Sequence, residues 1–169
     1  LWISILFCGI LLIGRSWALE RENEAVFALL LAPIPRPSIY IGKTISALIL
    51  LFVVELLLVP LCLVFFQIEP GGVLLPLVAL IFLGSVGFIS TASLFSAVGF
   101  RTRARDLMLS VLVFPLVAPA LLASAVATRE LFAGASMEEV IGWVRILTAF
   151  DLLFVGFGVW VSRHLLAET

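Results

Sequence analysis

Few side chains in this sequence could perform chemistry, and two of the carboxylates lie in apolar surroundings. Glu55 lies inside LFVVELLLVP, and Asp151 lies inside LTAFDLLF. A charged group at the centre of a bilayer costs at least about 2.5–3.5 kcal/mol, so Glu55 should face protein or water, or hold a proton, whereas Asp151 should have a partner of its own or lie near the outer interface. Glu55 can be a proton or substrate contact, or a residue that fixes helix packing by a hydrogen bond, and we favour packing. Arg145 lies six residues before Asp151, so the two should occupy different faces of a helix.

A nucleotide site or a catalytic constellation is not indicated. The GKT triplet at 42–44 resembles the end of a phosphate-binding loop, but the glycine required five residues earlier is Pro37. We expect Lys43 to extend to the membrane surface instead. The only histidine, His164, follows the last apolar stretch, and the two cysteines lie far apart in apolar runs. We therefore predict no catalytic, cofactor-binding or metal-binding residues.

The composition defines the solvent in which these residues must be positioned. Of 169 residues, 63% are hydrophobic and 12% are charged, whereas soluble domains are about half apolar and about a quarter charged. A membrane-spanning helix needs about 20 mostly apolar residues. Five stretches meet this requirement, at 1–19, 38–67, 73–98, 107–128 and 141–162. We predict an all-α integral membrane protein with one transmembrane domain over 1–169.

The distribution of basic residues indicates the orientation. Eight of the ten Lys and Arg residues fall on one side of the predicted spans and two, Arg129 and Arg145, on the other. We expect the basic side, which includes the C-terminus, to be cytoplasmic. That leaves the first residue outside and directly in a span, so we expect a sixth, N-terminal span in the full protein. The alternative is a five-span protein with a translocated N-terminus.

The third and fourth spans have distinctive compositions. The third is dense in small residues, which allow helices to approach closely in lipid: Gly84, Ser85, Gly87, Ser90, Thr91, Ala92, Ser93, Ser96 and Ala97. The fourth contains Pro115 and Pro119, which should kink it at successive turns. Such kinks occur in moving transporters and also in purely structural helices, and both interpretations stay open.

The connection at 20–37 combines alternating charge, an apolar octet and prolines. Charges alternate from position 20 to 24, residues 25–32 are apolar, and three prolines follow. A short helix on the membrane surface, ended by a rigid turn, fits this order. We expect this segment to dock a cytoplasmic partner, although a plain linker is the alternative. The expected contact residues are Glu20, Arg21, Glu22, Glu24, Phe27, Leu29, Leu30, Pro33 and Pro35.

A second cytoplasmic connection carries a short basic run. It contains Arg101, Arg103 and Arg105, followed by Asp106. Anionic lipid would hold such a run at about 1 kcal/mol per charge. A secondary contact with the same partner is the functional alternative.

Several stretches, taken in order, resemble one known family. They read ERENEAVFALLLAPIPRPSIYIGK at 20–43, LLFVVELLLVPL at 50–61, LGSVGF at 83–88, TRARDLMLSVLVFPLVAP at 102–119 and LTAFDLLF at 147–154. This order resembles the CcmB family, the membrane subunits of the cytochrome c maturation ABC complex, over essentially the whole chain. The first and fourth of these stretches are the most specific. The family resemblance implies an exporter-type permease with six spans.

The resemblance also implies partners and a location. It implies a non-catalytic subunit that pairs with a CcmA-like ATPase and with CcmC-like and CcmD-like subunits in the bacterial inner membrane. Hydrolysis of ATP by the partner would release a haem-loaded, CcmE-like chaperone or drive the export of haem itself. The outer connections contain no His, Cys or Tyr, and Met137 is their only conceivable axial ligand. We therefore expect haem to be handled rather than bound as a cofactor. An ABC permease for lipid, drug or polysaccharide and a membrane scaffold are the alternatives.

Overall fold

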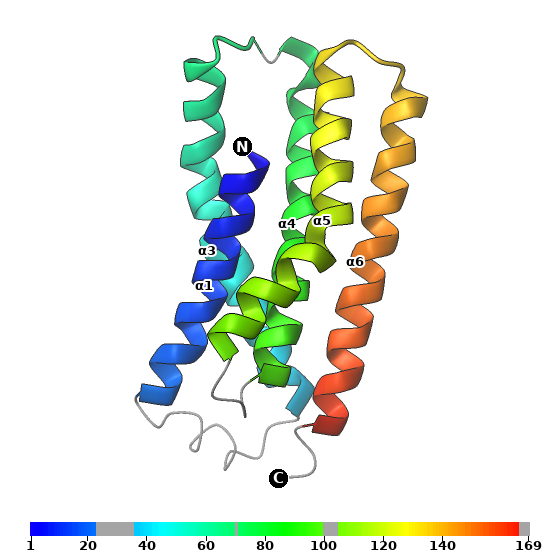
Figure 1. Cartoon of the computed structure of the whole chain (residues 1–169). Coiled ribbons are helices and arrows are strands. Elements are labelled where there is room, and N and C mark those ends of the chain that lie inside the picture. The colour runs from blue at the N-terminus through cyan, green and yellow to red at the C-terminus, as the bar shows by residue number, and fades with distance from the viewer. Residues whose placement is uncertain (23–35, 70, 100–104, 166–169) are drawn as a thin grey trace.

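The computed structural model describes residues 1–22, 36–69, 71–99 and 105–165, and over these residues the chain is helical with no strand. The long helices, in chain order, are α1 (Trp2–Glu22), α3 (Arg36–Phe65), α4 (Leu74–Gly99), α5 (Arg105–Phe132) and α6 (Met137–Leu165), with a short 3-10 turn, η1 (Gly71–Val73), before α4 (Figure 1). The prediction of an all-α membrane protein is confirmed.

Four of the described helices are long and apolar enough to cross a membrane, namely those over Pro37–Phe65, Gly71–Ser96, Leu112–Phe132 and Glu138–Arg163. They correspond to the second to fifth predicted spans. The apolar part of α1, Trp2–Arg15, is shorter than a full span. The helix continues beyond it to Glu22, because Arg15 and the charged residues that follow do not interrupt helical hydrogen bonding.

The helices alternate in direction, so that the connections collect at two ends (Figure 1). One end holds the end of α1, the start of α3, the end of α4, the start of α5 and the end of α6. The opposite end holds the α3–α4 and α5–α6 connections. The two predicted cytoplasmic connections therefore emerge from the same end of the bundle.

Helix α4 occupies the centre of the bundle. It contacts α1, α3, α5 and α6, and these four contact one another in the cyclic order α1, α3, α6, α5. Small residues explain why α4 can have four neighbours, because they let helix backbones come close in lipid. Ser85, Ser90, Thr91, Ala92 and Ser93 are all buried. The prediction that the small residues of this span permit close packing is confirmed.

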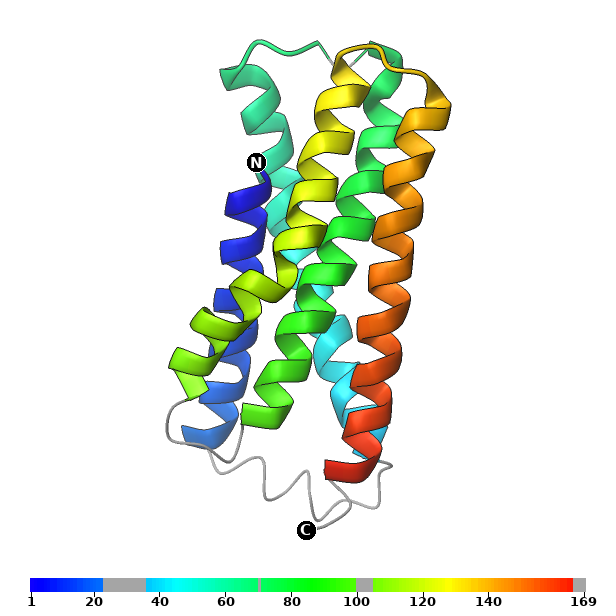
Figure 2. The same cartoon turned by 45° about the vertical axis from the view of Figure 1, so that its right-hand side comes forward.

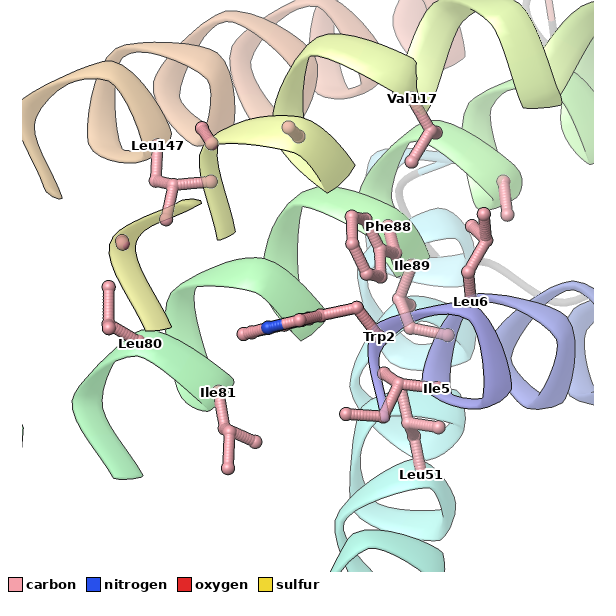
Figure 3. Close-up of a cluster of buried hydrophobic side chains, with 14 of the residues drawn as sticks. Trp2, Ile5, Leu6, Leu51, Leu80, Ile81, Phe88, Ile89, Val117 and Leu147 are labelled. Atoms are coloured by element: carbon pink, nitrogen blue, oxygen red, sulfur yellow. The ribbon is translucent and has the colours of Figure 1, made fainter. Parts of the chain in front are cut away.

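The apolar core forms where α1 meets α4 and α5. The Trp2 ring extends from α1 towards these helices and meets Phe88 edge to face, with ring centroids 6.0 Å apart (Figure 3). Its indole Nε1 donates a hydrogen bond of 3.0 Å to Thr128 Oγ1 of α5. Gly84 makes room for the ring, because a Cβ atom there would lie 2.8 Å from the Trp2 Cη2 atom.

Helix α5 bends in its middle (Figures 1 and 2). Its first part crosses α4 towards α1, and its second part runs alongside α4 and α6. Pro115 and Pro119 lie inside this helix, and each removes a backbone donor and crowds the preceding turn. The predicted kink is thus present.

Candidate functional site: polar contacts around the central helix

Of the residues expected to contact an ATPase, those that the structure describes lie at one end of the bundle. Glu20, Arg21 and Glu22 belong to the last turn of α1, and Arg105 and Asp106 open α5. The other predicted contacts fall outside the described residues: Glu24, Phe27, Leu29, Leu30, Pro33, Pro35, Arg101 and Arg103. The described parts of both connections therefore share the end at which α3 begins.

Glu55 of α3 turns inward to α4. Its side chain is only 4% exposed, and the Ser85 hydroxyl of α4 donates a hydrogen bond to its Oε1 atom. The second carboxyl oxygen, Oε2, has no hydrogen-bond partner among the described residues. A hydrogen bond between neighbouring helices is the contact that the packing interpretation of Glu55 requires.

Asp151 of α6 approaches α4 from another direction. It is 7% exposed, and its Oδ1 atom would lie 2.7 Å from a Cβ atom at Gly87. Only a glycine on α4 therefore leaves space for this carboxyl group. Arg145 of the same helix is exposed, so the prediction that these two charged residues occupy different faces is confirmed.

A third contact, formed by Tyr40 of α3, is one that the sequence analysis missed. The ring is 3% exposed, and its hydroxyl donates a hydrogen bond of 3.2 Å to the Ser90 carbonyl of α4. The same ring lies against Gly158 of α6, where an added Cβ atom would overlap the hydroxyl and come within 2.9 Å of Cε1. Two signals were available, because Tyr40 is the only tyrosine and Gly158 interrupts an apolar run.

At the opposite end of the bundle, one hydrogen bond joins α5 to α6, and a backbone turn ends α3. The Trp143 indole Nε1 of α6 donates a hydrogen bond of 2.7 Å to Glu130 Oε2 of α5, which ties the two helices together beside their connection. At the end of α3, the backbone N–H of Ile68 donates to the Leu63 carbonyl at 2.9 Å. Gln67 between them has a positive φ of 54°, as is typical of a helix C-terminal turn.

The three polar contacts all converge on the central helix α4. Glu55 and Asp151 contact α4 at different residues, Ser85 and Gly87. Within the part of the chain that the structure describes, no group of three or more His, Cys, Asp or Glu residues could hold a metal ion. What the three contacts do is join α3 and α6 to the central helix through polar or glycine-dependent packing.

An all-helical bundle with four helices long and apolar enough to cross a membrane, and with small and polar residues at its helix contacts, is typical of a multi-pass membrane protein. The family model described as CcmB protein matches residues 1–166, and the chain belongs to the CcmB family. Comparisons with curated proteins and with solved structures gave no match. The resemblance noted in the sequence is confirmed.

Membership of this family gives the general function. CcmB proteins are non-catalytic permease subunits, the membrane component of the haem-export ABC system for cytochrome c maturation. They work in a complex with other Ccm components. The chain is accordingly a multi-pass membrane protein of that system.

Proposed function

We propose that this chain couples ATP hydrolysis by a CcmA-like subunit to the release of a haem-loaded, CcmE-like chaperone. Its other partners are CcmC-like and CcmD-like subunits, and the complex lies in the bacterial inner membrane. The observation that carries this proposal is the family match over residues 1–166, which includes both basic connections and all the described helices. Haem is in this proposal a handled substrate and not a resident cofactor.

The coupling is assigned to the 20–37 segment. A permease can respond to a partner's nucleotide state only through a contact whose affinity differs between those states. The segment offers charged residues for orientation and an apolar octet for burial. It joins α1 to α3, and both of these helices contact the central helix α4. A displacement of the segment can therefore reach the central helix α4 through either α1 or α3.

The test changes one charged and one apolar residue of the segment. Glu24→Lys reverses a charge, and Leu29→Asp places a charge in the apolar octet. Each variant should insert in the membrane but capture less ATPase in a pull-down, or yield less mature c-type cytochrome in cells. Glu69→Lys, an exposed charge reversal at the other end of the bundle, is the matched control. Normal capture and normal cytochrome yield in both variants would make the segment a linker and move the coupling to 101–106.

Orientation can be tested by single-cysteine labelling. Gly72 follows α3 at the end of the bundle with few basic residues, is exposed, and has open space around it. In a chain without Cys8 and Cys62, a cysteine at Gly72 should react with an impermeant reagent from the periplasm, and one at Thr102 should not. The reverse pattern would contradict the proposed orientation.

Direct haem carriage can be separated from coupling. Because the outer connections offer only Met137 as an axial ligand, the isolated subunit should bind haem without a defined ligand spectrum. An axial-ligand absorption spectrum that disappears in Met137→Leu or His164→Ala would contradict this and indicate that the chain carries haem itself.

A further inference from the structure

The Tyr40 contact joins three helices at the end of the bundle where the proposed coupling segment enters. We call it the Tyr40 junction, and it consists of Tyr40, the Ser90 carbonyl and Gly158. In both views the first turns of α3 lie beside the last turns of α6 (Figures 1 and 2). The junction is thus a direct contact between the start of one helix and two others.

The contacts around Tyr40 restrict the movement of its ring. The ring is buried, and its hydroxyl is hydrogen-bonded to α4. On α6 the ring fills space that is open only because residue 158 is a glycine. Close packing of this kind transmits displacement, because protein interiors have low compressibility. One turn further along α3, the buried Thr44 hydroxyl donates to the Tyr40 carbonyl at 2.9 Å, so its polar group is satisfied within the same helix.

The position of the junction in the chain is as informative as its packing. Tyr40 lies in the second turn of α3, which begins at Arg36, so only a few helical residues separate it from the 20–37 segment. On α6, Gly158 lies seven residues after Asp151, two turns along and therefore on the same face. A displacement at Gly158 consequently acts on the face of α6 that also presents Asp151 to Gly87 of α4.

We infer that Tyr40 is a positioning residue that transmits movement of the 20–37 segment to α4 and α6. This inference rests on the proposed function, since it requires that the segment receives a force from the ATPase. It adds that Tyr40 is one of the side chains that pass this force from α3 to the central helix, and that the same ring passes it to α6. Loss of the junction should leave the complex assembled and hydrolysing ATP, with less chaperone released for each ATP consumed.

Two substitutions probe the junction with small changes. Tyr40→Phe keeps the ring and removes the hydroxyl that donates to the Ser90 carbonyl. Gly158→Ala adds one methyl group where Tyr40 lies. Gly156→Ala, on the same helix but with open space around it, is the matched control. All three are made in the full chain, in the reconstituted complex with its ATPase, its other membrane subunits and the haem-loaded chaperone.

The measured quantity is the number of chaperone molecules released per ATP hydrolysed, alongside the melting temperature and the amount of ATPase captured. For Tyr40→Phe we expect this ratio to fall about threefold to tenfold, as expected from losing a contact of roughly 0.6–1.4 kcal/mol between helices. Gly158→Ala should lower it further, and Gly156→Ala should leave it unchanged. A purely structural role would lower the melting temperature or the capture and leave the ratio intact.

The outcomes distinguish this inference from the proposed function. A parental complex that releases chaperone on hydrolysis, with Tyr40→Phe and Gly158→Ala variants that release as much per ATP, would overturn the role of Tyr40 alone. A parental complex that captures no ATPase, or releases no chaperone on hydrolysis, would overturn the proposed function and this inference with it. A fall in the ratio with unchanged capture would support both.

Discussion

Helices α3 and α4 are both strongly apolar, yet they occupy opposite environments. Helix α3 has the most apolar spanning segment and the least buried one, whereas α4 has the most buried segment despite its serine, threonine and glycine residues. Many large side chains of α3 are exposed, among them Leu56, Leu57, Val64 and Phe65. On α4 the buried set includes Ser85, Ser90 and Thr91.

This difference indicates which property places a helix at the centre of a bundle in lipid. Lipid tails are as apolar as leucine side chains, so hydrophobicity does not drive one helix inside another. Close approach and interhelical hydrogen bonds do, and both require small or polar side chains. Helix α3 accordingly contributes mainly through a few inward residues, such as Tyr40, Leu51 and Glu55.

The largest expected effect compares one phenylalanine on each helix. Phe88 of α4 is 1% exposed and contacts Trp2, whereas Phe65 of α3 is 78% exposed. Phe88→Ala should lower the free energy of unfolding by about 3 kcal/mol, because it leaves a cavity that the surrounding side chains cannot fill. Phe65→Ala should lower it by less than about 0.5 kcal/mol. Unfolding titrations in mixed detergent measure both, and equal effects would contradict the central position of α4.

The second prediction uses a matched pair of glycines. A Cβ atom at Gly84 of α4 would overlap Trp2, whereas one at Gly42 of α3 would meet open space. Gly84→Ala should destabilise the fold by about 1–3 kcal/mol through overpacking. Gly42→Ala should stabilise it by up to about 1 kcal/mol, because alanine favours helix. The same titrations give both values, and a neutral Gly84→Ala would mean that Trp2 is free to move away.

Much of this comparison could be predicted from the sequence. The apolar stretches located the helices, and the density of small residues in 84–97 indicated close packing of the third span. The side of the membrane predicted for each connection from its basic residues agreed with the end of the bundle at which that connection emerges. These features depend on local composition, which a single sequence displays directly.

Pairings between helices could not be predicted in this way. Nothing in the sequence relates Tyr40 to Gly158 or Trp2 to Gly84, because each pair depends on how distant helices are rotated and crossed. Glu55 was recognised as a residue that needs a partner, but its partner could not be named as Ser85. The side chains that join helices are therefore the part of the site that required the structure.

A third prediction tests the hydrogen bond between α3 and α4. Ser85→Ala removes the donor to Glu55 and should cost about 0.6 kcal/mol, the average for hydrogen bonds between membrane helices. In a double-mutant cycle with Glu55→Leu, the two changes should be coupled by a similar amount. Glu55→Gln, which keeps an acceptor oxygen, is the control and should support normal cytochrome yield. Loss of yield in Glu55→Gln with unchanged stability would favour a proton or substrate role over packing.

The smallest expected effect lies at the end of α3, in the backbone turn around Gln67. Gln67 has a φ of 54°, and the Ile68 N–H to Leu63 carbonyl bond closes the last turn around it. A residue with a Cβ atom pays about 1–2 kcal/mol in this left-handed conformation, and glycine avoids that strain but loses more freedom on folding. Gln67→Gly should therefore raise the free energy of unfolding by about 0.5 kcal/mol, while Gln67→Ala should not raise it. If Gln67→Gly unfolded like the parent, the left-handed conformation of Gln67 would not lower the stability of the chain.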